Sequence, residues 1–242
     1  MKTKYKRVLL KLSGEGLMGN EKFGISPKEL QTLALQIKDI VSAGIELCIV
    51  VGGGNIFRGA KGAAKGMNRT VADQVGMLAT LMNALCLQNA LEENGVSARV
   101  SSGLSVPQVC ENYMYRKAMR HLEKKRVVIF AGGTGNPYFT TDTGAVLRAS
   151  EMQCEAVLKS TQVDGVYSAD PKTNPKAVRY EEISYDEVIQ KQLRVMDLTA
   201  VALAKENNIP IIVFSQHEKD SLKKIVQGKG LYTIIKNNEV KQ

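Results

Sequence analysis

The chain contains no tryptophan, and histidine and cysteine are both scarce among its 242 residues. The four cysteines, Cys48, Cys86, Cys110 and Cys154, are scattered along the chain with no close pair. Neither His121 nor His217 joins them at a spacing typical of zinc sites. The pattern argues against a disulfide-rich scaffold and a zinc module, and we expect four reduced thiols in a reducing compartment.

Long apolar runs are missing too. No stretch approaches the roughly 18–20 consecutive apolar residues that cross a bilayer. The basic start of the chain is followed by only three apolar residues, at positions 8–10, before Lys11 interrupts them. Such a run is too short for a signal peptide and is typical of a first β-strand. We therefore expect a soluble, cytoplasmic protein with no membrane partner.

Several familiar phosphate-binding signatures are absent. The pattern G-x-x-x-x-G-K-[S/T] does not occur, which excludes an ordinary P-loop kinase, and the H-R-D and D-F-G motifs of protein kinases are missing. Gly14, Gly16 and Gly19 formally match the dinucleotide fingerprint. However, the next helix is expected only near Ser26, and the second strand ends in glycines rather than in an acidic residue. We interpret this match as accidental.

The charge is unbalanced, since 33 Lys and Arg residues face 24 Asp and Glu residues, a formal net charge of +9. This excess is compatible with nucleic-acid binding or with an attraction for small anions. Its densest part, residues 116–126, is typical of the polar face of a helix that leads into a strand. No RNA-binding signature accompanies it, so we favour a solvated helix face over a nucleic-acid interface.

Apolar strand-like runs alternate with helix-like periodic runs, which predicts an α/β fold with a largely parallel sheet covered by helices. We expect strands at residues 5–12, 46–51, 126–131, 156–160, 209–214 and 232–235, and helices at 26–44, 70–93 and 141–154. Residues 164–175 are predicted to form a loop or hairpin. Ser26 and Ser184 begin predicted capping boxes, each with a glutamate three residues later. The simplest organisation is one compact unit with two lobes.

The predicted helix at 70–93 is apolar on several sides, although a surface helix needs only one apolar stripe. A central core helix and a subunit interface explain this width about equally well. We therefore expect an oligomer.

Three glycine-rich loops directly follow predicted strands, at residues 13–16, 52–55 and 132–135. In parallel sheets, loops at the carboxyl ends of strands bind ligands. Glycine allows backbone N–H groups to approach phosphate oxygens closely. The three loops together predict a pocket for several phosphate groups.

A few charged residues beside these loops are candidates for chemistry. Lys11 interrupts a run that otherwise favours burial, so we expect its ammonium to offset phosphate charge rather than to lie on a solvent-facing edge. Arg58 follows the second glycine loop and could hold a phosphate through its planar guanidinium. Asp142 and Asp197 each lie near a helix start, where a capping role is the default interpretation.

Four segments then bring a family resemblance. KLSGE at 11–15, GGGNIFRG at 52–59, TGNPYFTTD at 134–142 and VDGVYSADP at 163–171 strongly resemble the bacterial UMP kinases of the amino acid kinase family. The similarity runs from about Tyr5 to the last strand. The segments G-T-G-N-P-[F/Y]-F and M-N-R-x-x-x-D, the second at 67–73, distinguish these kinases from members that act on amino acids.

The resemblance implies a three-layer αβα sandwich formed by residues 1–242 as a single domain. ATP would bind over the carboxy-terminal part, about 155–242, and UMP over the amino-terminal part. It also implies Mg²⁺ carried by ATP, with no protein metal site, and a homohexamer that GTP activates and UTP inhibits.

The resemblance further implies roles for individual residues. The catalytic set would be Lys11, Asp142 and Asp197. The ATP-binding set would be Lys11, Leu12, Ser13, Gly14, Gly54, Arg58, Thr161, Gln162, Tyr167 and Asp170. The UMP-binding set would be Gly53, Asp73, Thr134, Gly135, Asn136, Pro137, Tyr138, Phe139, Thr140 and Thr141. The segment implicated in GTP activation would be Gly19, Asn20, Glu21, Lys22, Phe23 and Gly24.

Three alternatives stay open at this point. The first is a sibling kinase that acts on a carboxylate such as acetylglutamate or aspartate. The second is a non-catalytic member of the fold that binds nucleotides or oxyanions, which the joint presence of Lys11, Asp142 and Asp197 disfavours. The third is a basic regulator that binds nucleic acid.

Overall fold

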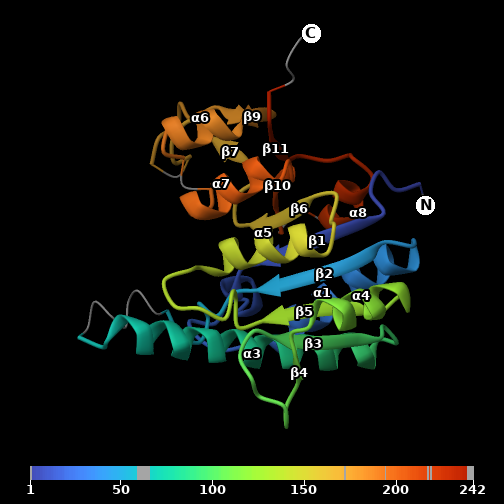
Figure 1. The fold of residues 1–242 in the computed structure, drawn as a ribbon. Helices are drawn as coiled ribbons and strands as arrows, with labels where there is room; N and C mark the ends of the chain where they lie inside the picture. The colour runs from blue at the N-terminus through green and yellow to red at the C-terminus, as the bar shows by residue number, and fades with distance from the viewer. Residues whose placement is uncertain are drawn as a thin grey trace.

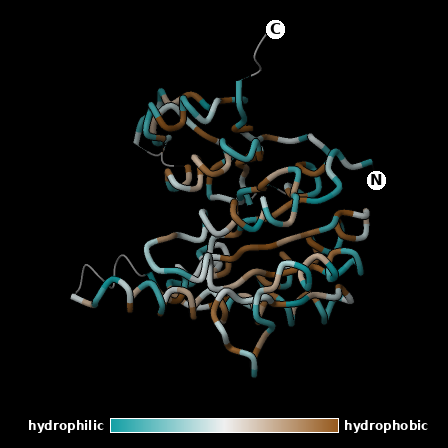
Figure 2. Tube along the Cα trace, viewed as in Figure 1, coloured by the Kyte–Doolittle hydropathy of each residue, from teal (hydrophilic) through white to brown (hydrophobic). Residues whose placement is uncertain are grey.

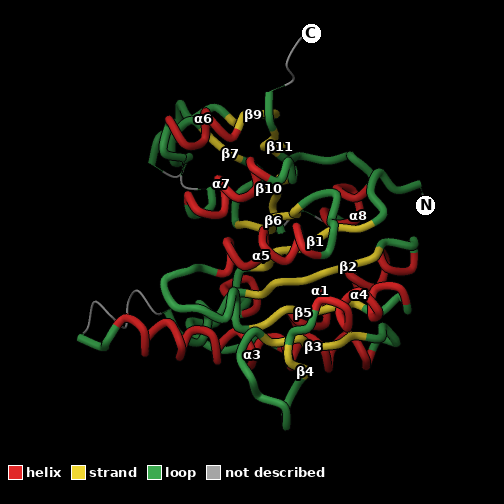
Figure 3. Tube along the Cα trace, in the orientation of Figure 1, coloured by secondary structure: helices red, strands yellow, loops and turns green. Residues whose placement is uncertain are grey.

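The structure is a computed structural model that describes residues 2–58, 66–171, 173–193, 195–216, 218 and 220–238. Helices lie on both sides of a central sheet, which gives three layers (Figure 1, Figure 3). The strands are β1 (Arg7–Leu12), β2 (Glu46–Val51), β3 (Ala98–Ser102), β4 (Glu111–Asn112), β5 (Val127–Ala131), β6 (Val157–Thr161), β7 (Val166–Tyr167), β8 (Arg179–Tyr180), β9 (Glu182–Ser184), β10 (Ile211–Ser215) and β11 (Thr233–Lys236). The helices are η1 (Gly14–Leu17, a 3₁₀ turn), α1 (Pro27–Ser42), α3 (Arg69–Glu93), α4 (Tyr115–Glu123), α5 (Thr141–Glu151), α6 (Tyr185–Gln190), α7 (Leu198–Glu206) and α8 (Ser221–Val226).

Within the described residues, the main sheet has the strand order β4-β3-β5-β2-β1-β6-β10-β11-β9. Neighbouring strands run parallel except for the antiparallel pair β10 and β11. Strands β7 and β8 form a separate antiparallel hairpin. The predicted αβα sandwich with a mainly parallel sheet is therefore confirmed. Strand β7 falls within the segment 164–175, predicted to be a loop or hairpin, whereas β8 lies beyond it.

Each face of the sheet has its own apolar core. One core lies between the sheet and α1, α3 and α8, and the other lies between the sheet and α4, α5, α6 and α7. Strand β1 supplies Leu10 and Leu12 to the first core and Leu9 to the second, as the alternation of side chains along a strand requires. The central strands are correspondingly hydrophobic along their length (Figure 2).

Most predicted elements are confirmed to within a few residues, and the strand at 46–51 is reproduced to the residue. Ser184 forms a complete capping box with Glu187, whereas Ser26 accepts a hydrogen bond from the Glu29 N–H. The prediction missed β3, β4, β8 and β9. Strand β3 reads Ala-Arg-Val-Ser-Ser, and four of its five residues are buried. Its three polar residues mask the apolar pattern by which a buried strand is usually predicted.

Helix α3 is long and rich in apolar residues, although it contains no uninterrupted run of roughly 18–20 of them. By length and composition alone, Arg69–Glu93 could cross a membrane. However, it lies along the sheet (Figure 1), and side chains such as Leu81, Leu87 and Leu91 belong to the first core. A core helix of a soluble fold meets the same criteria, and we interpret α3 in this way.

The outer surface of α3 keeps apolar side chains exposed. Val71, Leu78 and Met82 are 47%, 48% and 52% exposed, and their spacing of seven and four residues places them on one face. Helix α3 is therefore both a core helix and the carrier of an uncovered apolar stripe, so the two interpretations of its width are compatible.

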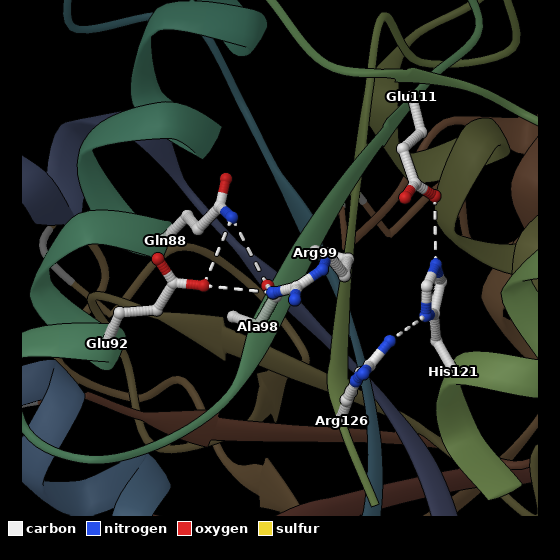
Figure 4. A network of polar contacts seen from close by, with 7 residues as sticks. All are labelled: Gln88, Glu92, Ala98, Arg99, Glu111, His121 and Arg126. Atoms are coloured by element: carbon white, nitrogen blue, oxygen red, sulfur yellow. Dashed lines mark hydrogen bonds and ion pairs between the residues drawn. The ribbon is translucent and has the colours of Figure 1, made fainter. Parts of the chain in front are cut away.

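A polar network holds the β3–β4 edge of the sheet (Figure 4). The buried His121 of α4 bridges Glu111 of β4 at 2.9 Å and Arg126 at 3.2 Å through its two ring nitrogens. Because the guanidinium can only donate, Nδ1 accepts from Arg126 and Nε2–H donates to Glu111. On the other side of β3, Arg99 forms an ion pair with Glu92 of α3 at 3.0 Å. These contacts give the partly basic helix α4 a structural role at the sheet edge.

All four cysteines are free thiols, in agreement with the sequence. Cys48 and Cys154 are buried in the second core, and burial raises the pKa of Cys48 well above its ordinary value. These thiols therefore pack as small apolar side chains.

Candidate active site

The three glycine loops follow β1, β2 and β5, and a fourth loop, rich in Asp and Gly, follows β6. The strands β5, β2, β1 and β6 are consecutive and parallel in the sheet. Their carboxyl ends therefore meet at one edge, and the loops that the sequence singled out come together there. This edge is the candidate active site.

A carboxylate held between two ammonium groups lies at the centre of this edge. Lys11 Nζ lies 2.7 Å from Asp142 Oδ1, and Lys159 Nζ lies 2.6 Å from Asp142 Oδ2. The two lysines are direct partners across the β1–β6 pair, and Asp142 approaches them from the first turn of α5. All three side chains are largely buried, with 10%, 12% and 14% exposure for Lys11, Lys159 and Asp142.

Mutual electrostatics sets the ionisation of this cluster. Burial alone would raise the pKa of Asp142, but the charges of Lys11 and Lys159 outweigh it and lower the pKa to about 2. Burial lowers the pKa of Lys159, and the neighbouring Lys11 adds to this effect while Asp142 opposes it. With both lysines protonated, the cluster carries one net positive charge inside the protein, which an approaching anion could neutralise.

The cluster also revises the default interpretation of Asp142. The side chain of Thr140, not that of Asp142, caps α5, by accepting from the Asp142 N–H at 3.0 Å. The Asp142 carboxylate is therefore available to the lysines. The capping interpretation was wrong for this residue.

Asp197 does cap its helix, because its carboxylate accepts from the Ala200 N–H at 2.8 Å. The same carboxylate also accepts from the hydroxyl of Thr143 at 2.8 Å and from that of Thr140. Asp197 therefore ties the amino end of α7 to the amino end of α5, beside Asp142. It positions the helix that presents the central carboxylate.

The first two glycine loops pack directly against each other. A Cβ on Gly14 would lie 2.4 Å from Asn55 Oδ1 and 2.7 Å from the Gly52 carbonyl oxygen, so no larger residue fits there. The Asn55 side chain forms a reciprocal amide pair with the buried Asn83 of α3, and Asn83 also donates to the Gly52 carbonyl at 2.7 Å. These hydrogen bonds fix the second loop to α3.

The third glycine loop owes its path to backbone conformations that glycine favours. Gly132, Gly133 and Gly135 all have positive φ angles, of 75°, 56° and 83°. The following Tyr138 also has a positive φ, of 70°, although its side chain is large and 67% exposed. An aromatic residue in this region is uncommon and indicates a position that its surroundings hold in place.

Asp73 is one of the residues that hold Tyr138 in place. Its carboxylate accepts from the Tyr138 N–H at 2.9 Å and pairs with Arg69 at 2.8 Å, and the Arg69 guanidinium lies over the Tyr138 ring at 5.5 Å. Asp73 thus lies directly beside residues 134–141, the segment with which the resemblance groups it. Phe139, in the same loop, is 48% exposed.

The residues expected at the other end of the site lie on β1, β2, β6 and the β7–β8 hairpin. Ser13 and Gly14 follow Lys11, and Arg58 reaches back to the Gly54 carbonyl at 3.4 Å and forms an ion pair with Glu15. Thr161 accepts from the Val163 N–H at 3.0 Å, and Tyr167 donates to Asp164 at 2.7 Å. Gln162 and Asp170 are exposed. Leu12 differs from this group, because its side chain is buried in the core on the opposite face from Lys11.

The segment 19–24 lies next to the second glycine loop. The Gly24 N–H donates to the Asn55 carbonyl at 3.0 Å, and Asn55 Nδ2 donates to the Gly24 carbonyl at 2.9 Å. Phe23 is 66% exposed. These hydrogen bonds connect the segment directly to the loop that carries Gly53 and Gly54, so a movement of one would displace the other.

Among the described residues, no group of three or more His, Cys, Asp or Glu side chains is arranged to hold a metal ion. Both oxygens of Asp142 already face ammonium groups. The carboxylates at this edge, Asp142 and Asp197, therefore fit a divalent cation that takes most of its ligands from phosphate and water, as Mg²⁺ commonly does.

Sequence reasoning missed Lys159, although a signal was present. The segments Leu-Leu-Lys-Leu, which ends β1, and Val-Leu-Lys-Ser-Thr of β6 each place a lysine after two apolar residues of a buried strand. Comparing the two strands would have identified the pair. Asn55 and Arg69 lie in segments that the sequence singled out, at 52–55 and 67–73, but neither was given a role in the site. Asn83 was missed because a single amide in a predicted helix carries no distinct pattern.

Comparison with known proteins agrees with this geometry. Residues 6–215 match the sequence profile of the amino acid kinase family. The chain belongs to the amino acid kinase family. Within it, the chain is 56% identical over 235 residues to a uridylate kinase of Paramagnetospirillum magneticum, covering 97% of this chain and 98% of that one. It is 57% identical over 232 residues to a uridylate kinase of Erythrobacter litoralis, covering 96% and 98%.

Solved structures of family members are also similar. The UMP kinase of Bacillus anthracis superposes with a TM-score of 0.93 at 39% identity, covering 97% of each chain. A uridylate kinase of Archaeoglobus fulgidus gives a TM-score of 0.73 at 28% identity, covering 94% of this chain and 99% of that one. The resemblance inferred from the four sequence segments is therefore confirmed.

The low pKa of Asp142 predicts a component of acid unfolding. A carboxyl whose folded pKa lies below its unfolded value of 3.8 stabilises the fold above about pH 4, and this stability is lost as pH falls towards 2. A shift from 3.8 to about 2 corresponds to about 2 kcal/mol. Urea unfolding between pH 6 and pH 2 should show this loss.

Asp142→Asn should lower stability at pH 7, because two buried ammonium groups lose their counter-charge, and should flatten the slope of stability below pH 4. Asp186→Asn, at a surface ion pair, is the control and should keep the slope. An unchanged slope in Asp142→Asn would contradict the predicted pKa.

Proposed function

We propose that this protein transfers the γ-phosphoryl group of ATP to the 5′-phosphate of UMP, giving UDP and ADP in pyrimidine nucleotide synthesis. The observation that carries the proposal is the cluster of Lys11, Asp142 and Lys159 at the meeting point of three glycine loops. Relatives named uridylate kinase match almost the whole chain at 56–57% identity, which supports the choice of acceptor.

The two substrates would occupy the two halves of a single domain. ATP would lie over the carboxy-terminal part, with its phosphates near Ser13, Gly14, Gly54 and Arg58 and its adenosine near the β7–β8 hairpin. UMP would lie over the amino-terminal part, between Gly53, Asp73 and residues 134–141. The contact between Asp73 and the Tyr138 N–H supports this grouping, since it joins two parts of the expected uridylate set.

The protein would contribute position and charge rather than a nucleophile. An oxygen of the UMP phosphate attacks the γ-phosphorus in line, as the bond from that phosphorus to the bridging oxygen of ADP breaks. Lys11 and Lys159 would stabilise the negative charge of the transferring group, and Asp142 would hold both ammonium groups at the correct distance. Asp197, through Thr140 and Thr143, would keep α5 aligned.

Mg²⁺ would enter with ATP, bound mainly by phosphate oxygens and water, with Asp142 and Asp197 as the neighbouring carboxylates. When bound, it would neutralise phosphate charge during the transfer. The free thiols fit a reducing compartment, and we place the protein in the cytoplasm.

The proposal extends to assembly and regulation. The uncovered apolar stripe of α3 supports an oligomer, which we propose to be a homohexamer activated by GTP and inhibited by UTP. Asn83 of α3 contacts the second glycine loop, and residues 19–24 contact Asn55 in the same loop. Both a subunit interface and an effector segment would therefore have a route to the phosphates.

Substrate identity is tested by ADP release in a coupled assay. With ATP and Mg²⁺, we expect turnover with UMP, much weaker turnover with CMP, and none with acetylglutamate or aspartate. Turnover with a carboxylate would favour a sibling kinase, and no ADP production with any acceptor would favour a non-catalytic binding protein. Repeating the assay with GTP or UTP tests the proposed regulation directly.

Lys11→Met and Lys159→Met should each lower kcat by about 10²–10³-fold, because each removes one charge that stabilises the transition state. The midpoint of thermal unfolding should fall less than for Asp142→Asn, since one ammonium still pairs with Asp142. Lys124→Met, an exposed lysine at the end of α4, is the matched control and should keep full activity. Near-normal kcat in Lys11→Met would remove this lysine from the mechanism.

Leu78→Glu combined with Met82→Glu should reduce the mass of the oligomer measured by light scattering after gel filtration. The reason is that two charges would be buried in the proposed α3 interface. Leu231→Glu, at an apolar residue that is 51% exposed elsewhere, is the control and should keep the native mass. An unchanged mass in the α3 variant would exclude this stripe as an interface.

A further inference from the structure

A cavity lies on the opposite face of the sheet from the lysine cluster. It measures about 240 Å³ and is enclosed by α1, η1 and α8 over the strands β1, β6 and β10. Leu10 and Leu12, which flank Lys11 along β1, form part of its floor. Because neighbouring residues of a strand point to opposite faces, the cavity and the Lys11 side chain are separated by the sheet.

The lining of this cavity is unlike a phosphate site. Its floor is apolar, with Phe214 and Leu222 beside the two leucines, and most of its polar groups are uncharged amides and hydroxyls. Among the described residues that line it, none is Lys or Arg, while Glu15 and Glu29 contribute carboxylates. An anion would therefore find no counter-charge here. A cation would find a carboxylate, and an uncharged molecule would find amides and hydroxyls to which it could form hydrogen bonds.

The carboxylate of Glu29 is well placed to receive a cation. It packs over Gly19, where a Cβ would come 3.3 Å from its Oε1. Within the described part of the chain it forms no ion pair, whereas Glu15 is paired with Arg58. A neighbouring hollow shares Glu29 with the cavity and is also lined by Asp39, Asp220 and Lys38, and by Glu218, which pairs with Lys224 at 2.6 Å.

A buried hydroxyl adds a second, independent sign of a ligand. Ser221, at the start of α8, is 3% exposed and lines the cavity, and its Oγ has no hydrogen-bond partner among the described residues. A buried polar atom without a partner is costly. A ligand that donates to or accepts from this hydroxyl would relieve that cost.

We infer that this cavity is a binding site for a small organic amine with an aromatic or compact apolar body. It is distinct from the expected nucleotide site, although Ser13 and Gln162 of the expected ATP-binding set also line it. The apolar body lies on Leu10, Leu12 and Phe214, the ammonium faces Glu29, and Ser221 completes the polar contacts. The charge of the lining argues against GTP or any other nucleotide as its occupant.

Such a ligand would contact the first glycine loop from the face of the sheet opposite the lysine cluster. The wall formed by η1 is the first glycine loop itself, and a Cβ on Gly16 would lie 2.5 Å from the Gln216 side chain, another lining residue. Ser13 and Gln162, expected on the nucleotide side, also border the cavity. Occupancy would therefore change the freedom of the loop that follows Lys11.

The test uses three indole probes that differ in charge: tryptamine, its neutral counterpart tryptophol, and the anion indole-3-acetate. Calorimetric titration of the full-length protein should show that tryptamine binds about tenfold more tightly than tryptophol, and that indole-3-acetate does not bind. Equal binding of all three probes, or no saturable binding of tryptamine, would overturn the inference.

Variants locate the site. Glu29→Gln should weaken tryptamine about tenfold and leave tryptophol within about twofold, whereas Glu206→Gln, an exposed glutamate at the end of α7, should change neither. Ser221→Val and Leu33→Phe fill the cavity from two different helices and should abolish binding of both probes. Unaltered tryptamine binding in a folded cavity-filling variant would place the probe elsewhere and overturn the inference.

Two controls separate this inference from the proposed kinase activity. Titration of tryptamine in the presence of Mg²⁺ and an unreactive ATP analogue should leave binding saturable, with a Kd that reaches a plateau as the analogue increases. A Kd that rises without limit would put tryptamine in the nucleotide site and overturn the inference. Glu29→Gln should retain UMP phosphorylation, so loss of amine binding in an active enzyme isolates the cavity from the catalytic centre.

Discussion

The structure depends on one carboxylate placed between two ammonium groups in a mostly buried setting. Asp142 neutralises Lys11 and Lys159 enough for two like charges to sit side by side on neighbouring strands, yet leaves a net positive charge for an anion. Burial of unpaired charge is costly, so the arrangement holds only while all three side chains keep their places. The cap of α5 by Thr140, and the tie from Asp197 to Thr140 and Thr143, serve this requirement.

The glycine loops are constrained by contact as much as by flexibility. Gly14 is surrounded so closely by the second loop that the two loops act as one surface, and Asn55 and Asn83 fix that surface to α3. The site is thus supported by the same helix whose outer face carries the uncovered apolar stripe. Helix α3 therefore holds the second glycine loop through Asn83 and would form the proposed subunit contact through its outer face.

The sequence predicted the layers, the parallel sheet and the convergence of the glycine loops, because hydrophobic periodicity and turn residues are local signals. It also identified Lys11, since a charge in an apolar strand is conspicuous. It did not identify Lys159, although the same pattern recurs there. The local pattern gave Asp142 no role beyond a helix start, and only the family resemblance placed it in the catalytic set. Pairing of Lys11 with Lys159, and the approach of Asp142 to both, are set by strand order, which no local pattern encodes. Strand β3 was missed because burial of its serines depends on neighbours far along the chain.

Strand order also affects how the protein comes to be made. Lys11 lies in the first strand, while its counter-charge and its companion lysine are supplied from the second half of the chain. During synthesis on the ribosome, β1 and β2 can pair early, but an ammonium destined for the interior must wait for more than half of the chain to emerge. We therefore expect β1 to reach its final packing only after translation has passed Lys159, which makes completion of the core and assembly of the Lys11–Asp142–Lys159 cluster one late event.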